Sequence, residues 1–121
     1  MSAKDYAEVF SARRVLRGKH FALHFRKQSR PGVESRETLI PRIGLVIPKK
    51  QARTAVLRNA IKRQAREVFR RRRPALPAMD LVLRLAAPTG VKNRPVASSD
   101  KLLWRNEIAG LLDRLCSHDG T

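Results

Sequence analysis

The sequence predicts an α/β layer structure with the element order α-β-β-β-α-β-α. Three observations support this prediction. Residues 20–27 alternate between apolar and small or polar side chains, as in a strand with one buried face. Residues 55–72 carry apolar side chains at the spacing of a helix that faces a core. Residues 80–86 form a short, mostly apolar run that is typical of a buried strand.

The other segments complete this order. A short helix is expected to begin at a capping Ser2 and to carry two aromatic residues on one face. Residues 13–17 are interpreted as a short strand and residues 43–47 as a longer apolar one, with a loop at residues 28–36 between the second and third strands. Right-handedness is the usual expectation for the crossover that follows, although these residues do not determine its hand.

The C-terminal segment is expected to form a core helix that begins at a capping serine, either Ser98 or Ser99. Its apolar stripe consists of Leu103 or Trp104, then Ile108, Leu111, Leu112 and Leu115. We therefore expect a single domain over residues 1–121, with an ordered core at about residues 4–115.

The composition indicates a folded protein with a polyanionic partner. The net charge of +17 and the pI near 11.7 favour a nucleic acid. A basic protein at a membrane surface is the competing interpretation, and the aromatic content of 5% argues against it. The chain has no apolar run near the ~20 residues that a membrane span needs, and its N-terminus lacks a signal-peptide pattern. Its one cysteine, Cys116, excludes an internal disulfide, so we expect a cytoplasmic protein.

Residues 49–73 concentrate the charge. They hold eleven Lys or Arg residues, eight of them Arg, and one acid, Glu67, so their net charge is +10. Like charges recur at four-residue spacing within the predicted helix, where they repel each other by a few tenths of a kcal/mol per pair. They are Arg58, Lys62, Arg66 and Arg70. A surface that tolerates this repulsion is typical of phosphate binding, for which the planar guanidinium is well suited.

Tyr6 and Phe10 have two possible roles, because an aromatic pair under the first helix can be core or can stack on unpaired bases beside a basic face. His24 could join them from the polar face of its strand.

Catalysis by the protein alone is not expected, because the ten acids are scattered. His20 and His24 are expected on one side of a strand, where they could serve as an acid–base pair, but at about 13 Å apart they are too far from each other to act on one phosphate.

Two neighbouring segments carry a specific pattern. In residues 42–50, RIGLVIPKK, a strand ends in two lysines, and residues 55–67, AVLRNAIKRQARE, follow as a helix. Together they closely resemble the protein subunit of bacterial ribonuclease P, whose helix has the form RNRxKRxxRE. The opening DYAEVF and the later LPAMD also match, so that the resemblance covers roughly residues 4–115. Ala60 departs from the pattern, since the family has the second arginine of its triplet there.

The resemblance implies a two-layer α/β (α+β) sandwich with a small mixed sheet and a left-handed strand–helix–strand crossover, which replaces the right-handed expectation. It also implies a protein component of an endonuclease that removes the 5′ leader from precursor tRNA. In this family the catalytic RNA, with Mg²⁺ held mainly by that RNA, performs the hydrolysis. The protein is implied to bind the RNA subunit and the single-stranded leader, the latter in a cleft between the basic helix and the sheet. No further protein partner and no membrane are required.

The resemblance also implies residue roles. The residues implied to bind the RNA subunit are Lys49, Arg53, Arg58, Asn59, Arg63, Arg66 and Arg70. Those implied to line the leader cleft are Tyr6, Phe10, Ala22, His24, Val46, Lys50 and Lys62. No catalytic residue and no metal ligand is expected in the protein. The alternative is a structural RNA-binding protein of ribosomal type with no role in cleavage.

Overall fold

The computed structural model describes residues 3–27, 41–91 and 94–119, with side chains described as far as residue 117. The predicted cap Ser2 and the predicted loop at residues 28–36 lie outside these ranges. Within them the elements follow the predicted order. They are α1 (Ala3–Ser11), β1 (Val15–Arg17), β2 (Phe21–Lys27), β3 (Arg42–Val46), α2 (Ala55–Arg72), the 3-10 helix η2 (Arg73–Ala75), β4 (Met79–Leu85) and α3 (Ser98–Asp119).

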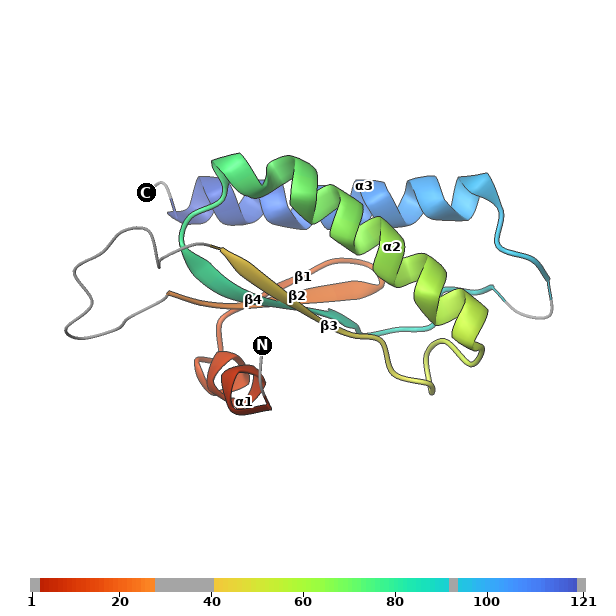
Figure 1. Cartoon of the computed structure of the whole chain (residues 1–121), viewed down its shortest axis with the longest axis horizontal. Helices are drawn as coiled ribbons and strands as arrows, with labels where there is room; N and C mark the ends of the chain where they lie inside the picture. Colours follow the sequence, from red (N-terminus) through yellow and green to blue (C-terminus); the bar gives the residue numbers. More distant parts are fainter. Residues whose placement is uncertain (1–2, 28–40, 92–93, 120–121) are drawn as a thin grey trace.

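The four strands form one mixed sheet in the order β1-β2-β4-β3. The pairs β1–β2 and β2–β4 are antiparallel, whereas β3 and β4 are parallel and are joined through α2. In Figure 1, β3 and β4 run in the same direction, α2 lies above them, and β4 lies behind β3. The β3–α2–β4 crossover is therefore left-handed, against the usual preference and as the family resemblance implied.

Helices α2 and α3 cover one face of the sheet, and α1 lies on the other face (Figure 1). The main core fills the space between the helix layer and the sheet. The predicted stripe of α2 is confirmed, because all four of its members are buried there: Leu57, Ile61, Ala65 and Val68. These side chains contact the apolar residues of β2 and β4 on the sheet face toward α2, among them Phe21, Leu23, Leu81 and Leu83.

Helix α3 decides which of Leu103 and Trp104 belongs to the core, and it corrects the prediction that a serine caps the helix. Trp104 is 3% exposed and joins the core, whereas Leu103 is 65% exposed. The helix begins at Ser98, but neither serine provides the observed cap. Instead the carboxylate of Asp100 accepts a hydrogen bond from the backbone N–H of Ala97 at 2.8 Å. This is the acid half of a capping box, in which a side chain in the first turn reaches back to the helix start.

The expectation that His20 and His24 share one side of a strand is wrong. His20 precedes β2, and its ring Nδ1 lies 2.9 Å from Glu107 Oε1 on α3. The other oxygen of Glu107 accepts hydrogen bonds from the backbone N–H groups of His20 and Phe21, both at 2.7 Å. His24 instead points toward α1, where its ring meets Phe10. The alternation of a strand does not apply to His20, because it belongs to the turn that α3 holds in place.

Candidate nucleic-acid interface

The solvent-exposed side of α2 carries several cations that no acid neutralises among the residues described by the structure. Thr54 caps the helix by accepting a hydrogen bond from the N–H of Leu57 at 3.1 Å. Burial of the apolar stripe turns the basic residues outward. Among the residues that the structure describes, no hydrogen bond or ion pair engages the side chains of a basic group that we call the α2 face. It consists of Lys49, Lys50, Arg53, Asn59, Lys62, Arg63 and Arg66.

Arg58 has a different position from its neighbours on α2. Its Nη1 donates to the carbonyl oxygens of Ala52 at 2.9 Å and Arg53 at 3.0 Å. These are carbonyls of the loop that joins β3 to α2. Arg58 therefore holds the basic loop against the start of the helix. This contact keeps Lys49, Lys50 and Arg53 next to the basic residues of the helix itself.

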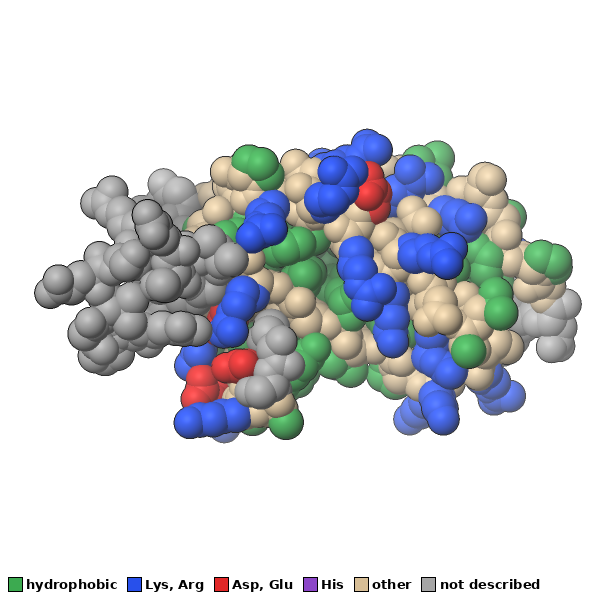
Figure 2. Space-filling model, in the orientation of Figure 1, with side chains coloured by type: hydrophobic (Ala, Val, Ile, Leu, Met, Phe, Trp, Pro, Cys, Tyr) green, Lys and Arg blue, Asp and Glu red, His purple; other side chains and the backbone are tan. Residues whose placement is uncertain are grey.

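The C-terminal end of α2 is partly neutralised. Arg70 and Arg71 both pair with Glu67, at 2.7 and 2.8 Å. Hydrogen bonds from Arg70 first, and then from Arg71, lower the pKa of Glu67 to about 2. Arg72 pairs with Asp113 of α3 at 2.8 Å. The unpaired cations of the helix, Lys62, Arg63 and Arg66, thus lie in its middle part. Figure 2 shows Lys and Arg side chains spread over α2 and the loop before it.

A second surface lies on the other side of the sheet, beneath and beside α1. Strand register arranges its side chains in three rows, which we call the outer sheet face. The first row is Arg42–Asp80–Arg26, the second is Gly44–Val82–His24–Val15, and the third is Val46–Arg84–Ala22–Arg17. Helix α1 covers the first two rows. Val9 of α1 and Val82 are both fully buried between the helix and the sheet, apart from the main core.

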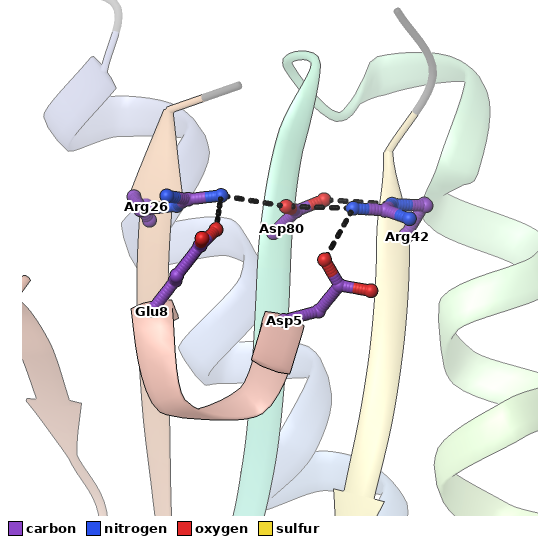
Figure 3. A network of polar contacts seen from close by, with 5 residues as sticks. All are labelled: Asp5, Glu8, Arg26, Arg42 and Asp80. Atoms are coloured by element: carbon purple, nitrogen blue, oxygen red, sulfur yellow. Dashed lines mark hydrogen bonds and ion pairs between the residues drawn. The ribbon is translucent and has the colours of Figure 1, made fainter. Parts of the chain in front are cut away.

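The first row fixes the position of α1 through a network of ion pairs (Figure 3). Asp80 is 1% exposed and accepts two hydrogen bonds from Arg42, both at 2.8 Å. These bonds raise the pKa of the Arg42 guanidinium. Arg26 lies 3.4 Å from Asp80 and 2.9 Å from Glu8 of α1, and Arg42 lies 3.8 Å from Asp5 of α1. Two acids of α1 and one of β4 therefore neutralise both arginines.

The second row carries the aromatic residues. Gly44 lies directly beneath Tyr6, and a Cβ at this position would collide with the ring and hydroxyl of Tyr6. Phe10 is 37% exposed, and its ring meets the His24 ring edge-on with centroids 4.7 Å apart. Burial lowers the pKa of His24, with a further contribution from the nearby charges of Arg84 and Arg17. Tyr6 is thus packed on the strand, while Phe10 presents part of its ring to solvent.

Five of the residues expected to line the leader cleft lie together on the outer sheet face or on α1: Tyr6, Phe10, Ala22, His24 and Val46. The predicted location of the cleft, between the basic helix and the sheet, is wrong because the main core fills that space. Lys50 follows β3 in the basic loop, and Lys62 is carried by α2 on the opposite side of the sheet. Ala22 is fully buried, so its side chain is part of the floor and offers no exposed contact.

Sequence reasoning missed three charged residues of this face, Asp80, Arg84 and Arg17. Arg84 is the one basic residue within the apolar strand at residues 79–85, and that interruption was a detectable signal. The role of Asp80 was not detectable, because its partners lie 38 and 54 residues away.

The described residues contain no group of three His, Cys, Asp or Glu side chains that could hold a metal ion. In the same part of the chain, no helix has the length and apolar character needed to cross a membrane.

The chain forms an α/β sandwich with a left-handed crossover, and its basic helix presents a surface that suits a polyanion. Residues 1–112 match the family model described as Ribonuclease P. The chain is 42% identical over 98 residues to the ribonuclease P protein component of Azoarcus sp. (strain BH72), covering 81% of this chain and 75% of the relative. It is 39% identical over 110 residues to that of Ralstonia pickettii (strain 12J), covering 90% and 72%. The chain therefore belongs to the family of ribonuclease P protein components.

Solved structures agree with this assignment. The RNase P protein of Staphylococcus aureus superposes with a TM-score of 0.72 at 22% identity, covering 94% of this chain and 91% of that one. The RNase P protein of Thermotoga maritima gives 0.65 at 25% identity, covering 92% and 91%. As the protein component of a ribonucleoprotein that acts in tRNA processing, the chain has an RNA partner.

Proposed function

We propose that the protein assists an RNA-catalysed cleavage of precursor tRNA and takes no chemical part in it. The α2 face binds the catalytic RNA subunit, and the outer sheet face with α1 binds the single-stranded 5′ leader. The RNA subunit supplies the hydrolysis of the phosphodiester bond. The Mg²⁺ that this reaction needs is held mainly by that RNA, because the positive potential around α2 disfavours a further cation on the protein.

The separation of the two surfaces is the observation that supports this division. The α2 face offers unpaired, exposed guanidinium and ammonium groups and no exposed aromatic ring among the described residues, which suits a phosphate backbone. The outer sheet face offers the partly exposed ring of Phe10 beside cations of the third row, which suits unpaired bases. The sheet and the main core lie between them, so both surfaces are accessible at once (Figure 1).

Each surface makes a different energetic contribution. If each of the six cations of the α2 face neutralises one phosphate, the affinity of the protein for the catalytic RNA should fall about 10³-fold between low and physiological salt. Stacking of a base on Phe10 contributes roughly 1–3 kcal/mol and depends little on sequence. The protein thereby increases the affinity of the complex for substrates that carry a leader.

A cleavage assay tests the proposal. Precursor tRNA is incubated at low Mg²⁺ with the protein alone, with the RNA subunit alone, and with both. We expect no cleavage by the protein alone and faster cleavage with both components than with the RNA alone. Cleavage by the isolated protein would overturn the division of labour. Equal affinity of the assembled complex for tRNA with and without a leader would favour a purely structural RNA-binding role.

A further inference from the structure

We propose that Arg84 and Arg17 form a phosphate-binding site on the third row of the outer sheet face, which takes the leader backbone next to a base stacked on Phe10. The inference rests on the proposed function, since it assigns a subsite to the same leader surface. It adds two arginines to which neither the sequence analysis nor the family resemblance assigned a role.

Strand register brings the two arginines together. Arg17 of β1 pairs with Ala22 of β2, and Ala22 pairs with Arg84 of β4, so the three side chains point to the same side of the sheet. Adjacent strands lie about 4.8 Å apart, which places the two arginine backbones about 10 Å apart. The residue between them is an alanine with no bulk to separate the two guanidinium groups. Arg17 is exposed and Arg84 is half-buried, so the row opens to solvent.

His24 orients the Arg84 side chain. The Nε of Arg84 donates a hydrogen bond to Nε2 of His24 at 3.3 Å, while the ring of His24 meets the edge of Phe10. This bond requires an unprotonated Nε2, and the lowered pKa of His24 agrees with that requirement. Arg84 therefore keeps its two terminal amino groups for a ligand. An aromatic ring, an imidazole and a guanidinium follow one another from α1 across the sheet.

The chemistry of the row fits a phosphate. Within the described residues, neither Arg84 nor Arg17 has an acidic partner, in contrast to Arg42 and Arg26 of the first row. An arginine with free terminal amino groups binds a phosphate through two parallel hydrogen bonds. Proximity to Phe10 favours single-stranded RNA, in which a base can stack while its backbone continues past the ring. We therefore assign the phosphate to the leader and not to the catalytic RNA.

The test compares Arg84→Met with a charge-matched control, Lys101→Met on α3, in complexes assembled with the catalytic RNA. Dissociation constants are measured for precursor tRNA with a leader and for the same tRNA without one. We expect Arg84→Met to weaken binding of the leader-bearing substrate about tenfold, the range of one charge-assisted hydrogen bond. We expect the salt slope for that substrate to fall by about 0.7. Binding of leaderless tRNA, assembly with the catalytic RNA and the Lys101→Met complex should be unchanged.

A second arm locates the phosphate. Single leader phosphates are replaced by uncharged methylphosphonates, and the wild-type complex should lose affinity at one or two neighbouring positions, whereas Arg84→Met should be insensitive there. His24→Leu should reproduce part of this insensitivity, and His24→Gln, which keeps an acceptor for Arg84, should restore the sensitivity of the wild type. Unchanged leader affinity in Arg84→Met, or equal loss with leaderless tRNA or in assembly, would overturn the site. If the wild-type complex bound precursor tRNA equally well with and without the leader, the proposed function itself would be overturned. The failure of the site and the failure of the function are therefore distinguishable.

Discussion

Two regions of this molecule use arginine in opposite ways. On the first row of the outer sheet face, Arg42 and Arg26 meet Asp80, Asp5 and Glu8, so that both cations are neutralised (Figure 3). On the α2 face, Arg63 and Arg66 are exposed, and among the described residues no acid reaches them. The same residue type fixes the position of a helix in one region and presents free charge in the other.

The difference between the two regions shows that the role of an arginine is decided by whether a buried acid lies beside it, more than by the arginine itself. Asp80 is almost fully buried, and such a carboxylate requires compensating donors that stay in place. Arg63 and Arg66 repel their neighbours and remain hydrated until a polyanion binds. Four predictions test this comparison, and they are given from the largest expected effect to the smallest.

Substituting Asp80→Asn should cause the largest loss of stability. It removes the charge that compensates Arg42 and Arg26, and we expect the free energy of unfolding to fall by about 2–3 kcal/mol, less than for a fully buried pair because both arginines are partly exposed. Urea unfolding measures this change. The control is Asp113→Asn, which breaks the exposed pair with Arg72 and should cost under about 0.5 kcal/mol. Equal losses would show that burial of the acid is not decisive.

Substituting Phe10→Ala should weaken leader-dependent binding by roughly 1–3 kcal/mol, the cost of one lost base stack. Tyr6→Ala should add to this, but it also removes packing on Gly44, so Phe10 gives the cleaner measurement. Affinities for precursor tRNA with and without the leader are compared in the assembled complex. Val56→Ala, which removes a 74% exposed apolar side chain from α2, is the control. A loss with leaderless tRNA would contradict the assignment of Phe10 to the leader.

Substituting Arg63→Ala should weaken assembly with the catalytic RNA by about 1 kcal/mol. The slope of log affinity against log salt should fall by about 1, because one phosphate contact is removed. Binding titrations at several salt concentrations measure both quantities. Arg72→Ala on the same helix is the matched control, and its pairing with Asp113 should make its salt slope close to that of the wild type. If both variants lowered the slope equally, the acid partner would not determine which arginines bind RNA.

Acid titration should give the smallest effect. Hydrogen bonds from Arg94 first, and then from the Ala97 N–H, lower the pKa of Asp100 to about 2, below its usual value of 3.8. A depressed carboxylate stabilises the fold above its unfolded pKa, so this contribution should decline as the pH falls below about 4 and be lost once the pH has fallen through the folded-state pKa of about 2. Asp100→Asn should cost about 1 kcal/mol at pH 7, as for a lost helix cap, and the part of this difference that depends on the charge should vanish only below about pH 2. Ser98→Ala should leave the free energy of unfolding unchanged. A decrease for this variant would show that the serine caps the helix after all.

Much of the fold was predictable because its signals are local. The bounds of α2 match the prediction at both ends, since Thr54 caps the helix and its apolar stripe is regular. The strands differ from their predicted bounds by one or two residues at their ends. The position of His20 was mispredicted, because a turn held by Glu107, 87 residues away in sequence, interrupts the alternation. The hand of the crossover came from the family resemblance and not from the residues themselves.

The candidate site was predictable only in part. The sequence identified the cations of α2, since a run of like charges is visible without any structure. It also identified Tyr6 and Phe10 as a pair on one helical face. It predicted a leader cleft between the basic helix and the sheet, where the main core lies, because periodicity shows which residues of a helix are buried and not whether the space beneath them is open.

The sequence by itself determined where the helices and strands lie, which helix face is apolar and where the positive charge accumulates, because these properties depend on residues a few positions apart. Only the tertiary structure decided which arginines are neutralised and which are free. Strand register joins Asp80 to Arg42 and Arg26, and it aligns Arg17 with Arg84 across Ala22. Such pairings form between segments distant in the chain, so their electrostatic consequences exist only once the sheet is assembled.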